Sequence, residues 1–201
     1  MPKPFTFRIL GSRPLYRGFT KFDMVDFEVV TRAGETKHIA REIEDHGRAV
    51  TVLPYDPARR EAVLVRQLRV PIAFKGEDDA YPLETIAGLM DVDGEGPEET
   101  ARREAREEAG LALGALDLVA IAYATPGLST ERVHLFLAEI ALDEARQDEG
   151  GGADHEGEDI EVMVLPLADL AARVDRHEIR DLKTVTLVQS LRLKRPELFA
   201  G

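Results

Sequence analysis

The chain has 201 residues and a formal net charge of −12, with 38 acidic against 26 basic side chains. Hydrophobic residues make up 44% of it, enough for one ordinary domain, and no apolar run reaches the roughly 18 residues of a membrane-spanning helix. The acidic balance argues against nucleic-acid binding, which would require a basic face. The absence of cysteine excludes disulfides and a cysteine nucleophile. We therefore expect a cytoplasmic protein with neither nucleic acid nor membrane as a partner.

The first ninety residues have the pattern of strands and turns. Alternation of apolar and polar residues predicts a strand over Phe19–Arg32, a turn at Ala33–Gly34 and a returning strand over Glu35–Ile43. Three further strands are expected at Ala49–Tyr55, at Glu61–Val70 and at Tyr81–Ile86.

A helix over Pro97–Ala109 follows, and it is the most informative element. A proline suits its first position, and Gly110 suits the residue that ends a helix. Glu104, Glu107 and Glu108 fall within about one turn of it. Like charges four residues apart destabilise a helix by a few tenths of a kcal/mol, about as much as a favourable ion pair stabilises it. Such a carboxylate cluster favours a site for a hard divalent cation over an ordinary charged surface helix.

Other faces of this helix also have expected contacts. Arg103 is placed to pair with Glu107 one turn later. A stripe of small residues at Ala101, Ala105 and Ala109 would allow the helix to pack closely against a sheet.

The segment from Gly88 to Leu111 resembles the Nudix box, G-x5-E-x7-R-E-U-x-E-E-x-G-U, where U is apolar. Every position from Glu95 onward matches, whereas six residues instead of five separate Gly88 from Glu95. The resemblance implies that the Ala87 carbonyl, Glu104 and Glu108 hold Mg²⁺, with Mn²⁺ as a possible substitute, and that Glu107 assists catalysis. The positions with an implied structural role are Gly88, Glu95, Arg103 and Gly110.

The remaining elements do not alternate strictly, which is typical of an α+β protein or a mixed α/β sandwich. The expected strands are Leu116–Ala124, Val133–Ile140 and Ile160–Leu165, and the expected helices are Leu167–Val174 and Leu182–Leu193. The resemblance implies the Nudix fold with an N-terminal antiparallel sheet. It divides the chain into a β extension at residues 1–44, for dimerisation and base binding, and a Nudix hydrolase domain at residues 45–201.

A Pro-Gly turn at Pro126 lies sixteen residues after Gly110. This spacing resembles the marker of the ADP-ribose pyrophosphatase branch, although Thr125 replaces the serine of that marker. The resemblance implies that Pro126 and Glu131 shape the pocket for the sugar-phosphate half of the substrate.

The acidic, glycine-rich stretch Asp148–Ile160 has the composition of a flexible linker. Its end nevertheless resembles the loop that delivers the general base in these pyrophosphatases, with the order E-x-E-D-I. On that resemblance Glu156 is the base and Glu158 helps with metal or geometry. His155 is an alternative base, since its ordinary pKa lies near neutrality.

Several arginines are candidates for binding the substrate, because a guanidinium offers paired donors to phosphate oxygens. Arg69 and Arg132 are the main candidates, and Arg66 could equally be an exposed strand residue. Arg41 and Phe19 lie in a stretch that resembles the N-terminal sheet of the ADP-ribose branch, where such residues hold the base. The same resemblance implies a homodimer.

The implied activity is Mg²⁺-dependent hydrolysis of a nucleoside diphosphate sugar, such as ADP-ribose, to a nucleoside monophosphate and a sugar phosphate. Glu178–Val185, the glycines at 150–152 and His134 resemble the GDP-mannose pyrophosphatases more closely, which leaves that substrate open. A Nudix domain that binds a nucleotide sugar without cleaving it is the alternative from another functional class.

Overall fold

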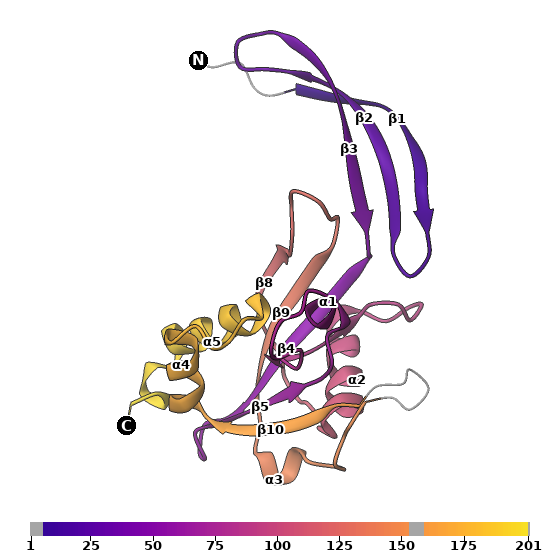
Figure 1. The fold of residues 1–201 in the computed structure, drawn as a ribbon. Coiled ribbons are helices and arrows are strands. Elements are labelled where there is room, and N and C mark those ends of the chain that lie inside the picture. The colour runs from indigo at the N-terminus through magenta and orange to yellow at the C-terminus, as the bar shows by residue number, and fades with distance from the viewer. Residues whose placement is uncertain (1–5, 153–158, 201) are drawn as a thin grey trace. The chain divides into compact units, whose positions relative to one another are not determined.

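A computed structural model describes residues 6–152 and 159–200. Contacts between Cα atoms divide the chain into two units, residues 1–48 with 123–132 and residues 49–122 with 133–201. Each unit has a sheet at its centre (Figure 1). Among the described residues, no helix has both the length and the apolar character needed to cross a lipid bilayer.

The first unit is an antiparallel sheet of three strands in the order β1-β2-β3. Its strands are β1 (Thr6–Arg17), β2 (Lys21–Val30) and β3 (Thr36–Asp45). The predicted hairpin is confirmed, and the Thr31 amide closes its turn by donating to the Glu35 carbonyl at 2.8 Å. The sequence does not predict β1 because register shifts after Ile9 and after Pro14 interrupt its alternation.

The second unit is built on a sheet of seven strands. Its main path runs β10-β5-β4-β9-β8, while β6 pairs with β5 and β7 pairs with β4. The strands are β4 (Arg48–Asp56), β5 (Glu61–Arg66), β6 (Leu83–Glu84), β7 (Ile86–Leu89), β8 (Asp117–Tyr123), β9 (Arg132–Glu139) and β10 (Glu161–Pro166).

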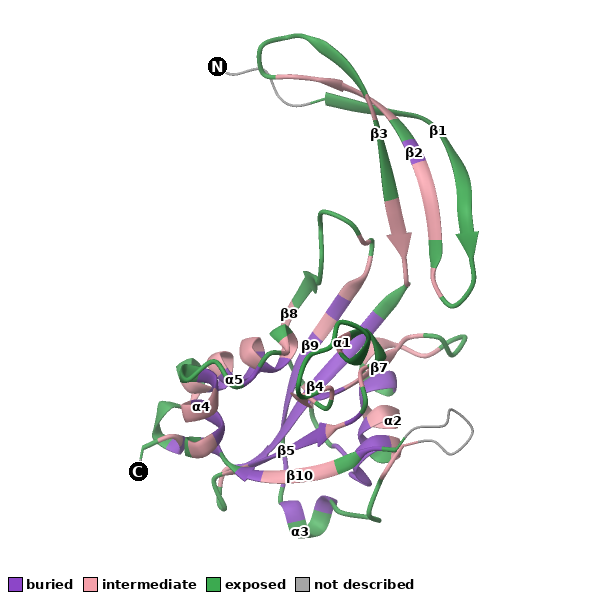
Figure 2. Cartoon of the chain, in the orientation of Figure 1, coloured by how far each residue is buried: buried purple, intermediate pink, exposed green. Residues whose placement is uncertain are grey.

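Alternate residues of the central strands face two separate cores. Leu53 of β4 packs in a cluster with the apolar residues of α4 and α5, whereas Val50 and Val52 pack in a second cluster with the alanine stripe of α2. These helices are α2 (Pro97–Ala109), α4 (Leu167–Asp175) and α5 (Leu182–Lys194). Figure 2 shows the buried strands between them. The sheet is therefore covered by helices on both faces, which confirms the predicted α+β sandwich.

Local signals explain where the main helices begin and end. α2 begins with Pro97 at its first position, and Gly110 ends it at a φ of 64°, a conformation that glycine adopts without strain. Asp181 caps α5 by accepting the Thr184 amide at 2.9 Å. The other helices are α1 (Val70–Phe74), α3 (Leu142–Ala145) and the 3₁₀ helix η2 (Pro196–Leu198).

Two predicted strands differ from the structure. The strand expected over Glu61–Val70 ends at Arg66, because Pro71 favours the start of a helix and begins α1 with its neighbour. The strand expected at Tyr81–Ile86 is instead two short strands that pair with different partners, β6 with β5 and β7 with β4.

Candidate active site

Two glutamates of α2 face strand β7. The Oε2 atom of Glu108 accepts a hydrogen bond from the Ala87 amide at 3.3 Å, and Glu108 is only 2% exposed. Glu104, one turn earlier, holds its carboxylate against Gly88, where an added Cβ would overlap it. Both carboxylates therefore point the same way, as their spacing of four residues predicts.

The packing of α2 brings the backbone of Ala87 close to these carboxylates. Ala87 lies opposite Thr51 in the antiparallel pairing of β7 with β4. The alanine stripe of α2 is fully buried against this part of the sheet, at Ala101, Ala105 and Ala109. Small side chains allow helix and sheet to approach closely, and this approach brings the Ala87 backbone within hydrogen-bond distance of the Glu108 carboxylate.

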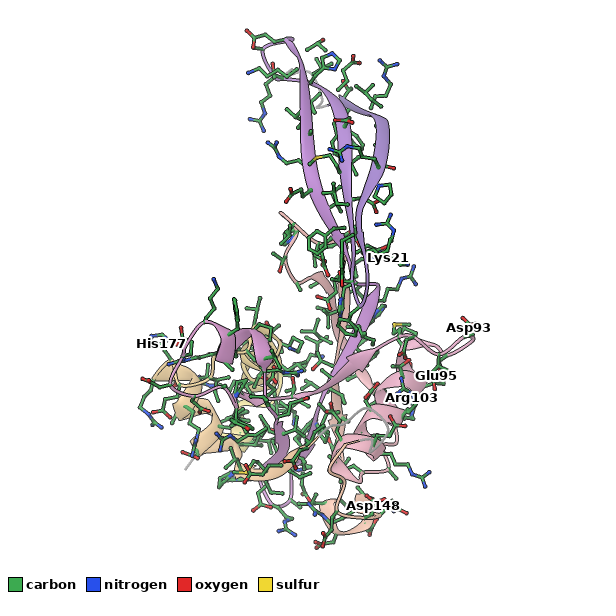
Figure 3. All side chains as sticks on the ribbon, turned by 45° about the vertical axis from the view of Figure 1, so that its right-hand side comes forward. Lys21, Asp93, Glu95, Arg103, Asp148 and His177 are labelled. Atoms are coloured by element: carbon green, nitrogen blue, oxygen red, sulfur yellow. The ribbon has the colours of Figure 1, made fainter. Side chains whose placement is uncertain are left out.

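Arg103 joins the loop after β7 to α2. Its guanidinium donates to Glu95 at 3.2 Å, to Glu107 at 3.0 Å and to the Leu89 carbonyl at 3.3 Å. It also forms an ion pair with Glu104 at 2.9 Å. Figure 3 shows Glu95 and Arg103 near one another where the loop meets the helix. One cation thus fixes the positions of several acidic groups at once.

The electrostatics of Arg103 are dominated by these neighbours. Burial lowers the pKa of its guanidinium, but the charge of Glu104 and the hydrogen bonds to Glu95 and Glu107 raise that pKa by more. Arg103 therefore stays charged. Four carboxylates, those of Asp91, Glu95, Glu104 and Glu107, share this one guanidinium, which leaves an excess of negative charge at this face of α2.

The donor set suits a hard divalent cation. Glu104 and Glu108 supply carboxylate oxygens and Ala87 supplies a carbonyl oxygen, which are the ligand types that Mg²⁺ takes. Within residues 6–152 and 159–200, no three acidic or histidine side chains are grouped so as to enclose an ion by themselves. Mg²⁺ binds through one or two carboxylates and completes its shell with water and substrate phosphate, so two carboxylates are sufficient.

The glycines that follow α3 are attached to the C-terminal end of α2. The amides of Gly151 and Gly152 donate to the carbonyls of Glu108 and Glu107, at 2.9 and 3.0 Å. A Cβ at Gly150 would lie 2.5 Å from the Glu108 carbonyl oxygen, and the φ of this glycine is 68°. Only glycine fits such a backbone approach without strain.

The predicted base, Glu156, follows these glycines in the sequence. The Ile160 amide donates to the Gly151 carbonyl at 3.1 Å, so both ends of the intervening segment are held near α2. Glu156, Glu158 and His155 themselves lie outside the described residues, and their roles stay predictions.

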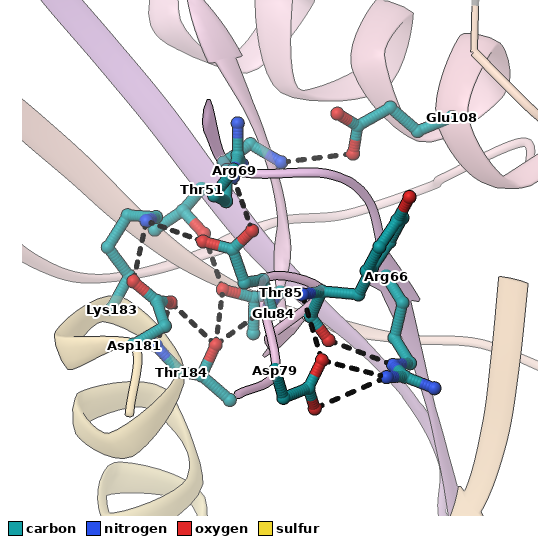
Figure 4. A network of polar contacts seen from close by, with 12 residues as sticks. Thr51, Arg66, Arg69, Asp79, Glu84, Thr85, Glu108, Asp181, Lys183 and Thr184 are labelled. Carbon is teal, nitrogen blue, oxygen red and sulfur yellow. Dashed lines mark hydrogen bonds and ion pairs between the residues drawn. The ribbon is translucent and has the colours of Figure 1, made fainter. Parts of the chain in front are cut away.

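Arg69 is held by a buried carboxylate (Figure 4). Its Nε donates to Oε2 of Glu84 at 2.6 Å, and Glu84 is 5% exposed. Among the described residues, no protein group binds the two terminal nitrogens of Arg69, which leaves them available for a phosphate. Arg66, by contrast, donates to the Tyr81 carbonyl at 3.0 Å and to Asp79 at 3.4 Å.

Four predicted substrate-binding residues belong to the first unit, namely Arg41, Pro126, Glu131 and Arg132. Arg41 donates to the Ala40 carbonyl at 2.8 Å. Phe19 is 84% exposed, and its ring packs edge-on against His46 with centroids 4.9 Å apart. The contribution of this unit to substrate binding stays a prediction.

The sequence does not predict a buried polar cluster beside β7. Its members are Thr51, Glu84, Thr85, Asp181, Lys183 and Thr184 (Figure 4). One usable signal is that Thr51 interrupts the otherwise apolar centre of β4. The other is the stretch 178–185, whose resemblance to the GDP-mannose pyrophosphatases names no role for its residues.

The glycine of β7, the glutamate-bearing helix α2 and the arginine that joins them are the parts that the resemblance to the Nudix box implies. The NUDIX domain model matches residues 45–187. The chain therefore belongs to the Nudix family.

Curated relatives extend over most of the chain. The GDP-mannose pyrophosphatase of Cronobacter sakazakii is 39% identical over 170 residues, which cover 85% of this chain and 86% of that protein. The GDP-mannose pyrophosphatase of Pectobacterium atrosepticum is 39% identical over 163 residues, 81% and 82% of the two chains. A crystal structure of an ADP compounds hydrolase superposes with a TM-score of 0.72 at 20% identity and covers 95% of both chains, which confirms the fold.

Proposed function

We propose that this Nudix hydrolase cleaves the pyrophosphate bond of a nucleoside diphosphate sugar, with GDP-mannose as the first candidate. Water attacks one phosphorus, and the products are a nucleoside monophosphate and a sugar phosphate. The observation that carries this proposal is the pair of carboxylates held against adjacent residues of β7, with Glu108 bound to the Ala87 amide and Glu104 against Gly88. The names of the relatives favour GDP-mannose, while the Pro126 marker supports ADP-ribose as the second candidate.

Mg²⁺ is the proposed metal, with Mn²⁺ as a substitute, and Glu104, Glu108 and the Ala87 carbonyl would hold it. When bound, the metal neutralises charge on the diphosphate and lowers the pKa of a bound water. Side chains of the protein position the carboxylates and bind the substrate phosphates. Arg103 keeps the carboxylates in place, and Arg69 offers its terminal nitrogens to phosphate oxygens.

Glu156 is the proposed general base, which takes a proton from the attacking water. A positioned base of this kind contributes about 10²–10⁴-fold to the rate. The support is the order of acidic residues at 156–159 and the hydrogen bonds that hold both ends of this segment near α2. Glu158 and His155 are the alternatives.

A homodimer formed through the N-terminal extension, residues 1–44, completes the proposal. Its support is the exposure of large apolar side chains on β1, where Phe7 is 71%, Ile9 59% and Tyr16 56% exposed. The cytoplasmic location and the absence of nucleic-acid and membrane partners stay predictions from composition.

A substrate panel tests the proposed activity. Purified protein with Mg²⁺ is given GDP-mannose, ADP-ribose and UDP-glucose, and the products are separated by ion-exchange chromatography. We expect GMP and mannose 1-phosphate, with the highest kcat/KM on GDP-mannose. Release of GDP or inorganic phosphate would contradict the proposed bond cleavage. Tight binding of GDP-mannose or ADP-ribose without turnover would instead favour a nucleotide-sugar sensor.

The same assay assigns the base. Glu156→Gln is expected to lower kcat by about 10²–10⁴-fold with little change in KM. Undiminished turnover of this variant would remove Glu156 from the role, and Glu158→Gln and His155→Gln would then be compared in the same way.

A further inference from the structure

The threonines and the glutamate of the polar cluster between α5, β6 and β7 are almost completely withdrawn from solvent, whereas Lys183 is only partly buried. Thr51 and Thr184 are 0% exposed, Thr85 is 1% exposed and Glu84 is 5% exposed. Buried polar groups are costly unless they are hydrogen-bonded, so each group must find its partner inside the cluster. All of these residues belong to the second unit.

One branch of the cluster is ionic and leads from α5 to Arg69. Lys183 donates to Asp181 at 2.7 Å, and its ammonium lies 3.7 Å from Oε1 of Glu84. The other oxygen of Glu84 accepts from Nε of Arg69 at 2.6 Å. Positive and negative groups alternate along this branch, and the four charges cancel. Loss of Lys183 would therefore leave a surplus carboxylate behind the guanidinium of Arg69.

The second branch is a chain of hydrogen bonds through three threonines, and its donors point away from Thr85 in both directions. Thr184 donates to Oδ2 of Asp181 at 2.7 Å and accepts from the Thr85 amide at 2.8 Å. Thr51 donates to the Ile86 carbonyl at 3.0 Å, because a carbonyl can only accept. Thr85 must then be the donor in its 2.8 Å contact with Thr51.

This second branch ends at the peptide group that precedes Ala87. Thr51 lies opposite Ala87 in the strand pairing. Its hydroxyl donates to the carbonyl of Ile86, the residue that precedes Ala87. The Ala87 amide in turn donates to Glu108. Figure 4 shows the contacts of Asp181 with Thr184, of Thr184 with Thr85 and of Thr85 with Thr51, and the separate contact made by Glu108.

We propose that the N-terminus of α5 positions both halves of the active site. Lys183 sets the position of Arg69 through Glu84, and Thr184 sets the backbone at Ala87 through Thr85 and Thr51. Asp181 joins the two branches, since it caps α5 and accepts from both Lys183 and Thr184. These are positioning residues, and the inference rests on the proposed function only for the roles of Arg69 and Ala87.

The two branches have different kinetic consequences. Arg69 is proposed to hold phosphate oxygens in substrate and transition state alike, so Lys183→Met is expected to raise KM more than it lowers kcat. The Ala87 backbone is proposed to be a metal ligand, so Thr184→Val is expected to lower kcat and Mn²⁺ affinity. Loss of groups that orient metal ligands typically costs about 10–100-fold in affinity or activity.

The test compares kcat, KM and Mn²⁺ affinity of Lys183→Met, Thr184→Val and Thr184→Ser. Serine restores the hydroxyl, so Thr184→Ser is expected to recover most of the loss that valine causes. Thr186→Val and Lys194→Met are matched controls, because the Thr186 hydroxyl donates to the Leu182 carbonyl of its own helix and Lys194 pairs with Asp117. Both controls should match the wild type.

Unchanged kinetics and unchanged Mn²⁺ affinity in both Lys183→Met and Thr184→Val would overturn the inference, as would a Thr184→Ser variant no better than valine. Mn²⁺ affinity, measured by electron paramagnetic resonance, needs no substrate. If the wild type hydrolyses no nucleoside diphosphate sugar, the proposed function fails, while the metal affinities of the threonine variants still decide the positioning role. If Thr184→Val does not fold, Lys183→Met decides through its KM, since Lys183 is only partly buried.

Discussion

The backbone of Gly88 and the carboxylate of Glu104 are in direct contact, and no side chain fits between them. Gly88 belongs to β7, whereas Glu104 belongs to α2, so this contact joins the strand to the helix at the proposed metal site. The φ of Gly88 is not in the left-handed region, so its backbone conformation does not require a glycine. The close approach of the Glu104 carboxylate does require one, because a Cβ would overlap it.

Gly88→Ala is expected to inactivate the enzyme without unfolding it. The new methyl group must displace the Glu104 carboxylate, and a displacement of about 1 Å in a catalytic group can cost roughly 100-fold in rate. Gly114→Ala is the control, since a Cβ at Gly114 meets no atom within 4 Å. Steady-state kinetics and circular dichroism on both variants check the prediction, which normal activity of Gly88→Ala would contradict.

Glu108→Gln is expected to abolish stabilisation by metal. A ligand at 100 times its Kd stabilises the folded protein by about 2.7 kcal/mol. We expect Mn²⁺ to raise the melting temperature of the wild type, and chelation to reverse the increase, but neither to affect Glu108→Gln. Glu98→Gln, on an exposed position of the same helix, should respond like the wild type. An equal Mn²⁺ response in Glu108→Gln would exclude this residue as a ligand.

Arg103→Lys is expected to lower both stability and activity, although the charge is kept. A single ammonium cannot reproduce the contacts that the guanidinium makes with Glu95, Glu107 and the Leu89 carbonyl. Hydrogen bonds to charged groups are worth about 1.5–3 kcal/mol each, so a loss of that order in the free energy of unfolding is expected. Urea denaturation measures it, with the exposed Arg106→Lys as the control expected to change by less than about 0.5 kcal/mol.

Asp181→Asn is expected to weaken the dependence of the free energy of unfolding on pH in the acid range. Burial raises the pKa of Asp181, but the charge of Lys183 and the hydrogen bonds from Lys183 and Thr184 lower it by more, so its pKa lies below the ordinary 3.8. A carboxyl with a lowered folded pKa stabilises above its unfolded pKa, and this contribution disappears as the pH falls through the folded pKa. Asparagine still caps a helix but does not titrate.

Urea unfolding at pH 7, 5, 4 and 3 makes the comparison for Asp181. The wild type should be more stable than Asp181→Asn at pH 7 and at pH 5, and the difference should shrink below about pH 4. Parallel profiles for the two proteins would show that Asp181 does not titrate with a lowered pKa.

The sequence predicts α2 and its two glutamates because every determinant is local. The first-turn proline, the alanine stripe and Gly110 lie within one short segment, so the bounds of the helix and the direction of Glu104 and Glu108 follow from helical periodicity. By contrast, β1 is not predicted, since shifts of register break the alternation on which a strand prediction depends.

The threonine cluster shows a different limit of sequence reasoning. Thr51 and Thr85 are 34 residues apart, and Thr184 follows Thr85 by 99 residues. No periodic pattern connects such positions, because only the folding of β4, β6, β7 and α5 against one another brings them together. The sequence therefore indicates the proposed metal ligands but not the groups that hold them.

An anomalous diffraction experiment tests the metal site most directly. Crystals of the wild type are soaked with Mn²⁺ and a non-hydrolysable analogue of GDP-mannose, and the anomalous difference map is inspected beside α2. We expect a peak in contact with the carboxylates of Glu104 and Glu108 and the carbonyl of Ala87. A map without a peak at these oxygens, although the analogue is bound, would contradict the proposed mechanism.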